Sequence, residues 1–171
     1  MTSNQEELKY AVFNTEAGWL GVLASDKGLK ALSLPQPSKE RVLKRLRLKP
    51  AGAVDSNDFF EELENQLNCY FGGKAVTFNQ KLDITQATDF QRKVWRASRL
   101  IPHGETRSYL WLAEKIGYPK AARAVGQALA RNPLPVIIPC HRVIREDGSL
   151  GGFSGGLRTK KRLLALEKAD R

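Results

Sequence analysis

Short apolar runs separated by turn residues open the chain. They are KYAVFNT at 9–15, WLGVLAS at 19–25 and LKALSLP at 29–35. Runs of this length, rich in aliphatic and aromatic residues and separated by short turns that contain Gly or Asp, are typical of β-strands joined by tight turns. The first third of the chain is therefore expected to form a β-sheet.

Helical periodicity follows the predicted strands. Residues 38–49 place apolar side chains three and four positions apart behind Ser38, a favourable N-cap residue. After a predicted loop at 50–58, residues 58–71 repeat the pattern and end at two consecutive glycines. The apolar side of this second helix is expected to contain Phe59, Leu63, Leu67 and Tyr70.

A change of pattern over residues 81–89 predicts a domain boundary. We expect an N-terminal domain at 1–85 and a C-terminal domain at 86–171. Residues 90–101 form the first predicted helix of the second domain. Its apolar positions are Phe90, Val94, Trp95, Ala97 and Leu100.

Two short helices follow at 108–117 and 120–132, with a Gly-Tyr-Pro break between them. This arrangement is typical of a helix-turn-helix, in which the second helix contacts DNA. A last helix is predicted over 157–170, after a glycine-rich segment at 145–156 that can bring backbone N–H groups close to a flat ligand. The C-terminal domain is therefore expected to be mostly helical.

The second helix of this pair has two different faces. Its expected buried stripe consists of Ala121, Val125 and Leu129. Another face carries Ala122, Arg123, Gly126 and Gln127. Glycine inside a helix costs roughly 1 kcal/mol relative to alanine, so this face is shaped for close approach by a partner. The partner is either another helix or a nucleic-acid backbone, and in the second case Arg123 projects toward it.

The distribution of charge favours nucleic acid. The net charge is +10, but residues 1–90 sum to −1 and residues 91–171 sum to +11. A basic excess confined to the half that contains the helix-turn-helix points to a polyanionic partner. The alternative is a basic surface that only keeps the protein soluble.

The chain contains two cysteines, Cys69 and Cys140. No apolar run reaches the roughly 18 residues of a membrane span, and the first residues lack the pattern of a secretory signal. These features predict a cytoplasmic protein with reduced thiols. Cys69, inside the helix predicted at 58–71, is expected to be a partly buried structural thiol.

Residues 132–144, NPLPVIIPCHRVI, combine an apolar run with prolines that exclude a regular strand. The run leads to Cys140 and His141, and a histidine can take the proton of a thiol to form a nucleophilic thiolate. Glu167, an acid in the otherwise basic run at 157–168, is the best candidate to orient that histidine. The alternative is a buried cysteine beside a hydrogen-bonded histidine, with no chemistry.

Three segments together resemble the O6-alkylguanine-DNA alkyltransferases, also called methylated-DNA–protein-cysteine methyltransferases. They are FQRKVWRASRLIPHGETRSYLWLAEKIG at 90–117, RAVGQALARNPLPVIIPCHRVI at 123–144 and GGFSGGLRTKKRLLALE at 151–167. Residues 1–89 fit the family's variable N-terminal domain only in size and pattern. The resemblance implies an α/β fold: a small ribonuclease-H-like domain with an antiparallel β-sheet and helices, then a mostly helical, winged-helix-like domain carrying the helix-turn-helix.

The activity implied by the resemblance is direct reversal of DNA damage. The alkylated guanine of a double-stranded DNA is flipped out of the stack, and its O6-alkyl group is transferred irreversibly to Cys140. Each molecule acts once, and repair of O4-alkylthymine is left open. The resemblance implies no cofactor and no metal ion, and the protein is expected to be a monomer in solution.

Residue roles are carried over position by position. Cys140 matches the nucleophile, His141 the base that acts through a water molecule, and Glu167 the acid that orients the histidine. Asn132 matches the asparagine that braces this segment. Tyr109 matches the tyrosine that crowds the phosphate beside the flipped guanine and donates a hydrogen bond toward it.

Further matches concern DNA and the guanine pocket. Arg123 matches the finger that fills the space vacated by the base, on a helix face that also carries Ala122 and Gly126. The pocket matches are the wall residue Pro135, the carbonyls of Cys140 and Val143, the N–H of Ser154 and the stacking residue Phe153. The family commonly has tyrosine at that last position, so a hydroxyl is missing here, which leaves the ranking of alkyl groups open.

Two other functions fit part of the pattern. A lesion sensor would flip alkylguanine without transfer, but proteins of that kind lack the cysteine that stands here at position 140. A cysteine hydrolase would use Cys140 and His141, but it needs an oxyanion hole and leaves the basic helix-turn-helix without a role.

Overall fold

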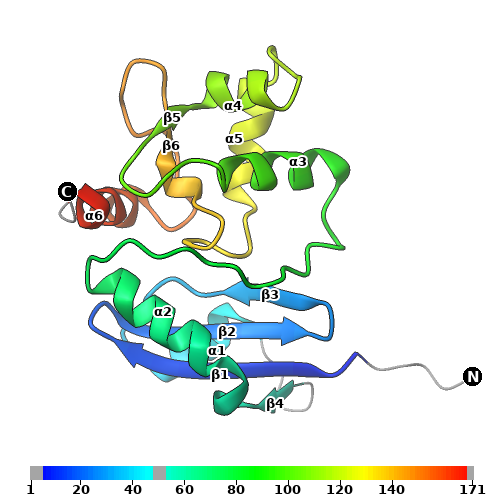
Figure 1. Cartoon of the computed structure of the whole chain (residues 1–171), viewed down its shortest axis with the longest axis vertical. Helices are drawn as coiled ribbons and strands as arrows, with labels where there is room; N and C mark the ends of the chain where they lie inside the picture. Colours follow the sequence, from blue (N-terminus) through cyan, green and yellow to red (C-terminus); the bar gives the residue numbers. More distant parts are fainter. Residues whose placement is uncertain (1–5, 48–52, 169–171) are drawn as a thin grey trace, which may run out of the picture. The chain divides into compact units, whose positions relative to one another are not determined.

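The computed structural model (Figure 1) describes residues 6–47 and 53–168. Two compact units make up the chain: residues 1–72 with 76–85, and residues 73–75 with 86–171. The first unit contains a β-sheet with helices, and the second is mostly helical. The α/β class expected from the sequence is confirmed.

The first unit is built on a four-stranded sheet in the order β3-β2-β1-β4. Strands β1 (Leu8–Thr15), β2 (Gly18–Ser25) and β3 (Gly28–Leu32) are antiparallel neighbours, whereas β4 (Ala53–Asp55) runs parallel to β1. The expected antiparallel sheet is confirmed for β1, β2 and β3, and β4 adds one parallel pair that was not expected. Strand β4 lies inside the segment 50–58 that is predicted as a loop, because three residues are too few to show an alternating pattern.

Helix α1 (Lys39–Arg45) begins as predicted at Ser38, whose Oγ accepts a hydrogen bond from the N–H of Arg41 at 3.3 Å. The helix ends earlier than predicted, with Leu46 as its C-cap. Residues 48 and 49 of the predicted helix lie outside the described residues. The helix packs against β2, where Gly21 leaves room for it.

The second helical segment of this unit starts as the 3₁₀-helix η1 (Asn57–Phe60) and continues as α2 (Glu61–Phe71). Phe60 is buried and Phe59 is 56% exposed, which corrects the predicted apolar side. A 3₁₀-helix turns by about 120° per residue instead of 100°, so the buried stripe shifts by one position in the first turn. Cys69 is exposed, not partly buried as expected.

The second unit contains three packed helices followed by the segments that carry the site. Its elements are α3 (Asp89–Ser98), β5 (Arg107–Ser108), α4 (Tyr109–Lys115), α5 (Ala122–Ala130), η2 (Cys140–Arg142), β6 (Val143–Ile144) and α6 (Leu157–Lys168). Helices α3, α4 and α5 pack on one another. The parallel pair β5–β6 joins the start of α4 to the end of η2 and so brings Tyr109 and Cys140 into one region.

Packing of α3 differs from the prediction at its end. The helix begins at a capping box formed by Thr88 and Gln91 and ends at Ser98. Leu100 is therefore 63% exposed, whereas Ile101 is buried. The Nε1 of Trp95 donates to the carbonyl of Ala128 at 2.9 Å and ties α3 to α5.

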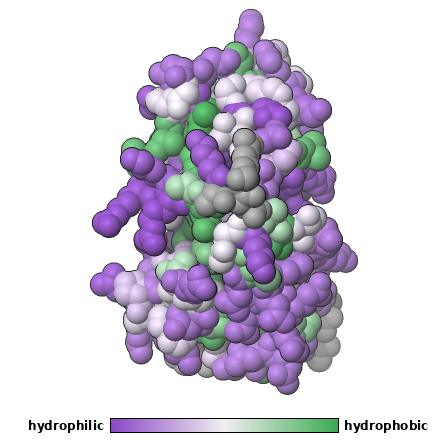
Figure 2. Space-filling view, turned by 60° about the vertical axis from the view of Figure 1, so that its left-hand side comes forward, coloured by the Kyte–Doolittle hydropathy of each residue, from purple (hydrophilic) through white to green (hydrophobic). Residues whose placement is uncertain are grey.

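Within the described residues, no helix combines the length and the apolar composition that a bilayer span requires. Figure 2 shows one face of the molecule, on which hydrophilic residues form most of the surface and hydrophobic residues form small patches. Among residues 6–47 and 53–168, the exposed large hydrophobic side chains are Val54, Phe59, Leu100, Leu110, Tyr118 and Leu157.

The first unit contains a buried carboxylate near its C-terminal end. Asp83 accepts hydrogen bonds from the Ser25 and Thr85 hydroxyls, both at 2.6 Å, and lies 3.5 Å from the ammonium group of Lys30. Burial alone would raise the pKa of Asp83, but these hydrogen bonds and the Lys30 charge outweigh it and lower the pKa to about 2. The carboxylate form therefore stabilises the fold.

We predict that Asp83→Asn lowers the free energy of unfolding by on the order of 2 kcal/mol at pH 7. Because the folded-state pKa lies below the unfolded value near 4, this contribution is present above pH 4 and is lost as the pH falls toward 2. Urea unfolding of both proteins between pH 7 and pH 3 measures it. A difference between the two proteins that does not shrink at low pH contradicts the prediction.

Candidate active site

Cys140 directly follows a tight turn formed by residues 135–138. An isolated bridge pairs Pro135 with Ile138, and Val136 between them has a φ of 75°. A β-branched residue rarely adopts this left-handed conformation, which costs roughly 1–3 kcal/mol and persists only where the surroundings enforce it. Val136 is buried, so packing holds the turn. The 3₁₀-helix η2 then begins at Cys140, which is 5% exposed.

Asn132 braces this turn from inside. Its Oδ1 accepts from the N–H of Leu134 at 2.8 Å, and its Nδ2 donates to the carbonyl of Ile138 at 2.8 Å. The same Nδ2 lies 3.2 Å from the Cys140 Sγ and donates to it. One side chain therefore fixes both the loop and the thiol that the loop presents.

The surroundings of the Cys140 thiol favour its protonated form. Burial raises its pKa, while the Asn132 hydrogen bond and the positive charge of Lys160 act in the opposite direction without cancelling that effect. The thiol therefore needs a base at the moment of reaction, because the thiolate is the nucleophilic form.

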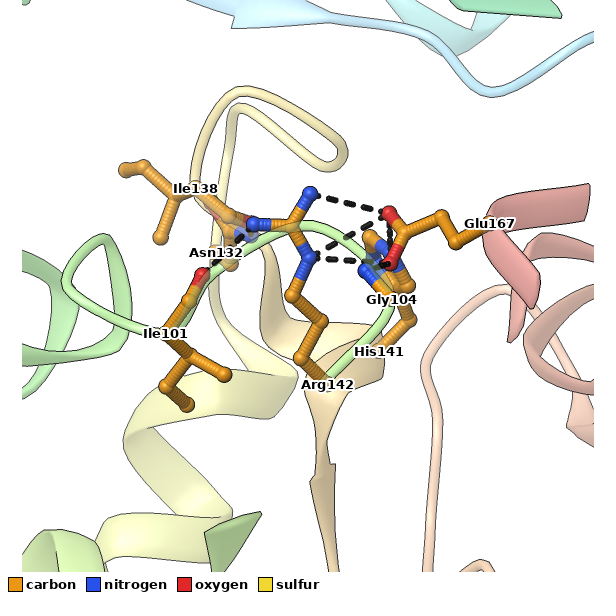
Figure 3. A network of polar contacts seen from close by, with 7 residues as sticks. All are labelled: Ile101, Gly104, Asn132, Ile138, His141, Arg142 and Glu167. Carbon is orange, nitrogen blue, oxygen red and sulfur yellow. Dashed lines mark hydrogen bonds and ion pairs between the residues drawn. The ribbon is translucent and has the colours of Figure 1, made fainter. Parts of the chain in front are cut away.

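The Glu167 carboxylate, on α6, accepts hydrogen bonds from two neighbouring side chains of η2 (Figure 3). His141 Nε2 lies 2.6 Å from Oε1, and Arg142 donates through Nε at 3.0 Å to Oε2 and through Nη2 at 2.9 Å to Oε1. The N–H of Gly104 donates to Oε2 at 3.2 Å. His141 and Glu167 are both fully buried.

Burial and this hydrogen-bond network together determine whether His141 is protonated and on which nitrogen. Burial raises the pKa of Glu167, but the hydrogen bonds from His141 and Arg142 and the positive charge of Arg142 outweigh burial and hold that pKa well below its usual range. Burial lowers the pKa of His141 and prevails over the opposing influence of Glu167. A neutral His141 facing a carboxylate must carry its proton on Nε2, which leaves Nδ1 as the nitrogen able to accept a proton.

A cavity of about 630 Å³ opens onto Cys140. One wall is a face of α5, and another is the glycine-rich segment before α6. The lining residues are Tyr109, Ala122, Arg123, Gly126, Gln127, Leu129, Ala130, Cys140, Arg145, Gly151, Gly152, Phe153 and Ser154.

Most of the predicted site residues lie in or directly behind this lining. Seven of them line the cavity: Tyr109, Ala122, Arg123, Gly126, Cys140, Phe153 and Ser154. Asn132, His141 and Glu167 are buried and linked to the η2 segment by the contacts above. Pro135 and Val143 are buried but are not among the lining residues.

The Tyr109 ring fits between two glycines. A Cβ at Gly126 would lie 3.6 Å from the ring, and one at Gly151 would lie 2.7 Å from the hydroxyl. The hydroxyl donates to the carbonyl of Gly152 at 3.4 Å. Burial, followed by the nearby Cys140, raises the pKa of Tyr109, so its hydroxyl stays a hydrogen-bond donor.

Lys160 is a site residue that the sequence analysis misses. Its fully buried ammonium group donates to the carbonyls of Val143 at 2.6 Å and Gly152 at 3.2 Å, and also to that of Leu150. Burial lowers the pKa of Lys160 to about 8. The available signal is its spacing: Lys160, Leu163 and Glu167 recur at helical intervals on the buried side of α6.

Other lining residues absent from the predicted site are Gln127, Leu129, Ala130, Arg145, Gly151 and Gly152. Gln127 was already expected on the Arg123 face of α5, and Ala130 could have been added to it, because it follows Arg123 by seven positions. Nothing in the pattern of the sequence marks Arg145, which the turn at 145–149 brings to the cavity.

Comparisons with known proteins agree with this geometry. Residues 8–84 match the ribonuclease-like domain of 6-O-methylguanine DNA methyltransferase, and residues 89–169 match its DNA binding domain. A methylated-DNA–protein-cysteine methyltransferase of Methanosarcina barkeri is 43% identical, over 93% of this chain and 96% of that protein.

Solved structures give the same result. A crystal structure of Mycobacterium tuberculosis OGT in complex with DNA aligns with a TM-score of 0.79 at 39% identity, covering 95% of this chain and 94% of that one. The M. tuberculosis O6-methylguanine methyltransferase aligns with a TM-score of 0.78 at 39% identity, covering 96% and 94%. With both of its units matched and a relative 43% identical over nearly its whole length, the chain belongs to the 6-O-methylguanine DNA methyltransferase family.

Proposed function

We propose that this protein repairs double-stranded DNA by transferring the alkyl group of O6-alkylguanine to Cys140, once per molecule. The observation that carries the proposal is the cavity that joins the Arg123 face of α5 to the Cys140 thiol. Family membership supports it, because relatives with similar sequences are named methylated-DNA–protein-cysteine methyltransferases.

The reaction exchanges one bond for another. His141 Nδ1 takes the thiol proton through a water molecule, and the sulfur attacks the alkyl carbon on the side opposite O6. A sulfur–carbon bond forms, the carbon–oxygen bond breaks, and its electron pair leaves with the guanine, which regains a proton. The Tyr109 hydroxyl donates a hydrogen bond to the guanine as negative charge develops on it. The proton that the guanine gains is the one that the thiol lost, passed on from His141 through water, so no other reactant is needed. The thioether product does not hydrolyse, so Cys140 is consumed.

The DNA-facing roles follow from the α5 surface. Arg123 is exposed and, in this proposal, fills the stack after the guanine has left it. Ala122 and Gly126 have no side chain that projects far from the helix, so a phosphate backbone can approach closely. Arg145 is also exposed at the cavity and supplies a second cation for a nearby phosphate.

The guanine itself is held by backbone groups and one ring. We assign the carbonyls of Cys140 and Val143 and the N–H of Ser154 to the guanine edge, Phe153 to its face, and Pro135 to the alkyl end. The Val143 carbonyl already accepts from an ammonium group, but a carbonyl oxygen has two lone pairs and can accept a second hydrogen bond.

We further propose that the protein acts in the cytoplasm as a monomer. The cytoplasmic location is supported by the two cysteines, which are expected to be reduced thiols, and the monomeric state is proposed from the family resemblance. Size-exclusion chromatography with light scattering tests the oligomeric state.

The decisive test is the intact-protein mass after mixing with excess duplex DNA containing O6-methylguanine. We expect the mass to rise by one methyl group per molecule and no further, and we expect Cys140→Ser to show no increase. Lesion-dependent binding without any mass increase would instead identify a lesion sensor. An increase that persists in Cys140→Ser would place the acceptor elsewhere.

We predict that Gly151→Ala slows methyl transfer by at least tenfold, because the new Cβ would lie within 3 Å of the Tyr109 hydroxyl. Gly148→Ala is the matched control. Gly148 also has a positive φ, but a Cβ there meets nothing within 4 Å. Single-turnover rates of both variants and of the parent protein measure the effect. If both variants are slowed equally, backbone strain and not the contact with Tyr109 is responsible. If neither is slowed, the prediction is wrong.

Substituting Arg123 with alanine should slow transfer from duplex DNA by roughly tenfold, which corresponds to about 1.4 kcal/mol, because the guanidinium no longer fills the space that the flipped guanine leaves. Transfer from the free base O6-methylguanine should not change, since no stack has to be opened. Arg131→Ala, an exposed arginine at the C-cap of the same helix, serves as the control. Equal losses on duplex and free base would remove Arg123 from the flipping step.

A further inference from the structure

Arg142 is a buried cation that the reaction described above does not use. It is 8% exposed and directs three hydrogen bonds at the Glu167 carboxylate, two from Nε and one from Nη2. Its Nη1 donates to the carbonyl of Ile101 at 2.7 Å, so the guanidinium is held at both ends (Figure 3). The two neighbouring side chains of η2, His141 and Arg142, therefore converge on one carboxylate.

Two groups could balance the negative charge of Glu167. One is a protonated His141, whose Nε2 lies 2.6 Å from Oε1. The other is Arg142, whose guanidinium does not lose its proton in proteins. Compensation by arginine is permanent, whereas compensation by histidine would consume the only acceptor nitrogen of the ring. The base function of His141 thus requires that the arginine carry this charge.

We propose that Arg142 is a positioning residue that neutralises the Glu167 carboxylate and thereby keeps His141 neutral, with its proton on Nε2 and Nδ1 able to accept the thiol proton. This inference concerns the same site as the proposed function. It rests on that function only where it states that the neutral histidine accepts the thiol proton.

The other charged groups near His141 do not replace this effect. Lys160 on α6 also lowers the pKa of His141, but it donates to backbone carbonyls and not to Glu167. The Cys140 thiol is protonated and therefore neutral. Helix α3 also packs on η2, and its buried residues, none of them titratable, are Val94, Trp95, Ala97 and Ser98. The segment that contributes the Gly104 N–H also carries His103, the second histidine of the chain.

Removal of the guanidinium should therefore protonate His141. A carboxylate within about 4–6 Å raises the pKa of a neighbouring base by 1–3 units when nothing offsets it. In Arg142→Met we expect the His141 pKa to rise by at least about one unit. In Arg142→Lys, which keeps the charge but loses the two-pronged contact, the pKa should stay closer to that of the unchanged protein.

An NMR titration of the His141 imidazole between pH 5 and pH 9, in the full chain without DNA, tests this expectation. His103→Asn in every sample leaves His141 as the single histidine signal. This titration does not depend on alkyl transfer, so it tests Arg142 even if the mass experiment fails. A His141 titration that is the same in Arg142→Met and in the parent protein overturns the proposal.

A double variant separates charge from structure. Arg142→Met with Glu167→Gln removes both charges, and we expect the His141 pKa to return to or below its parent position. An unpaired buried charge is also relieved in the double variant, so it should fold even if Arg142→Met does not. A raised His141 pKa in the double variant would contradict the proposal.

The pH dependence of methyl transfer gives the functional reading. Arg142→Met should acquire an acidic limb in its single-turnover rate, with about a tenfold loss one unit below the new His141 pKa. Arg142→Lys should restore most of the rate. A purely structural role would lower the rate equally at every pH, and this outcome would also overturn the proposal.

Discussion

A fully buried negative charge at Glu167 constrains the C-terminal unit. A carboxylate without solvent is tolerated only when its oxygens are hydrogen-bonded and its charge is balanced. The partners come from two other segments, η2 and the stretch that follows α3, so α6 can dock only where all of them are present. The same contacts that hold the last helix in position also determine which nitrogen of His141 carries a proton.

Lys160 and Arg142 solve the problem of a buried cation in different ways. Arg142 faces an acid, whereas Lys160 faces backbone carbonyls that carry no net charge. Three carbonyl acceptors from β6 and the glycine-rich segment offset part of the cost of burying the ammonium group, and in return their positions are fixed. The Lys160 hydrogen bonds therefore link three backbone carbonyls in and beside the glycine-rich wall of the cavity.

Features that depend on residue type and regular spacing could be predicted from the sequence. The first strands, the helix pair at 108–132 and the contact between His141 and Glu167 belong to this class. Strand β4 was not predictable because three residues show no period, and Phe60 replaced Phe59 because a 3₁₀ turn changed the period locally. The helical spacing of Lys160 with Leu163 and Glu167 indicates which side of α6 it lies on, but its carbonyl partners, like the partners of Arg142, could be identified only from the structure.

The order of the site residues along the chain has a consequence for synthesis. Glu167 follows Cys140 by a whole turn-and-helix segment, and His141 has no carboxylate to orient it until α6 has left the ribosome and docked. Before that moment the cysteine sits beside an unoriented histidine. The carboxylate that orients His141 is therefore in place only after the helices of the helix-turn-helix, which precede α6 in the chain, have been synthesised.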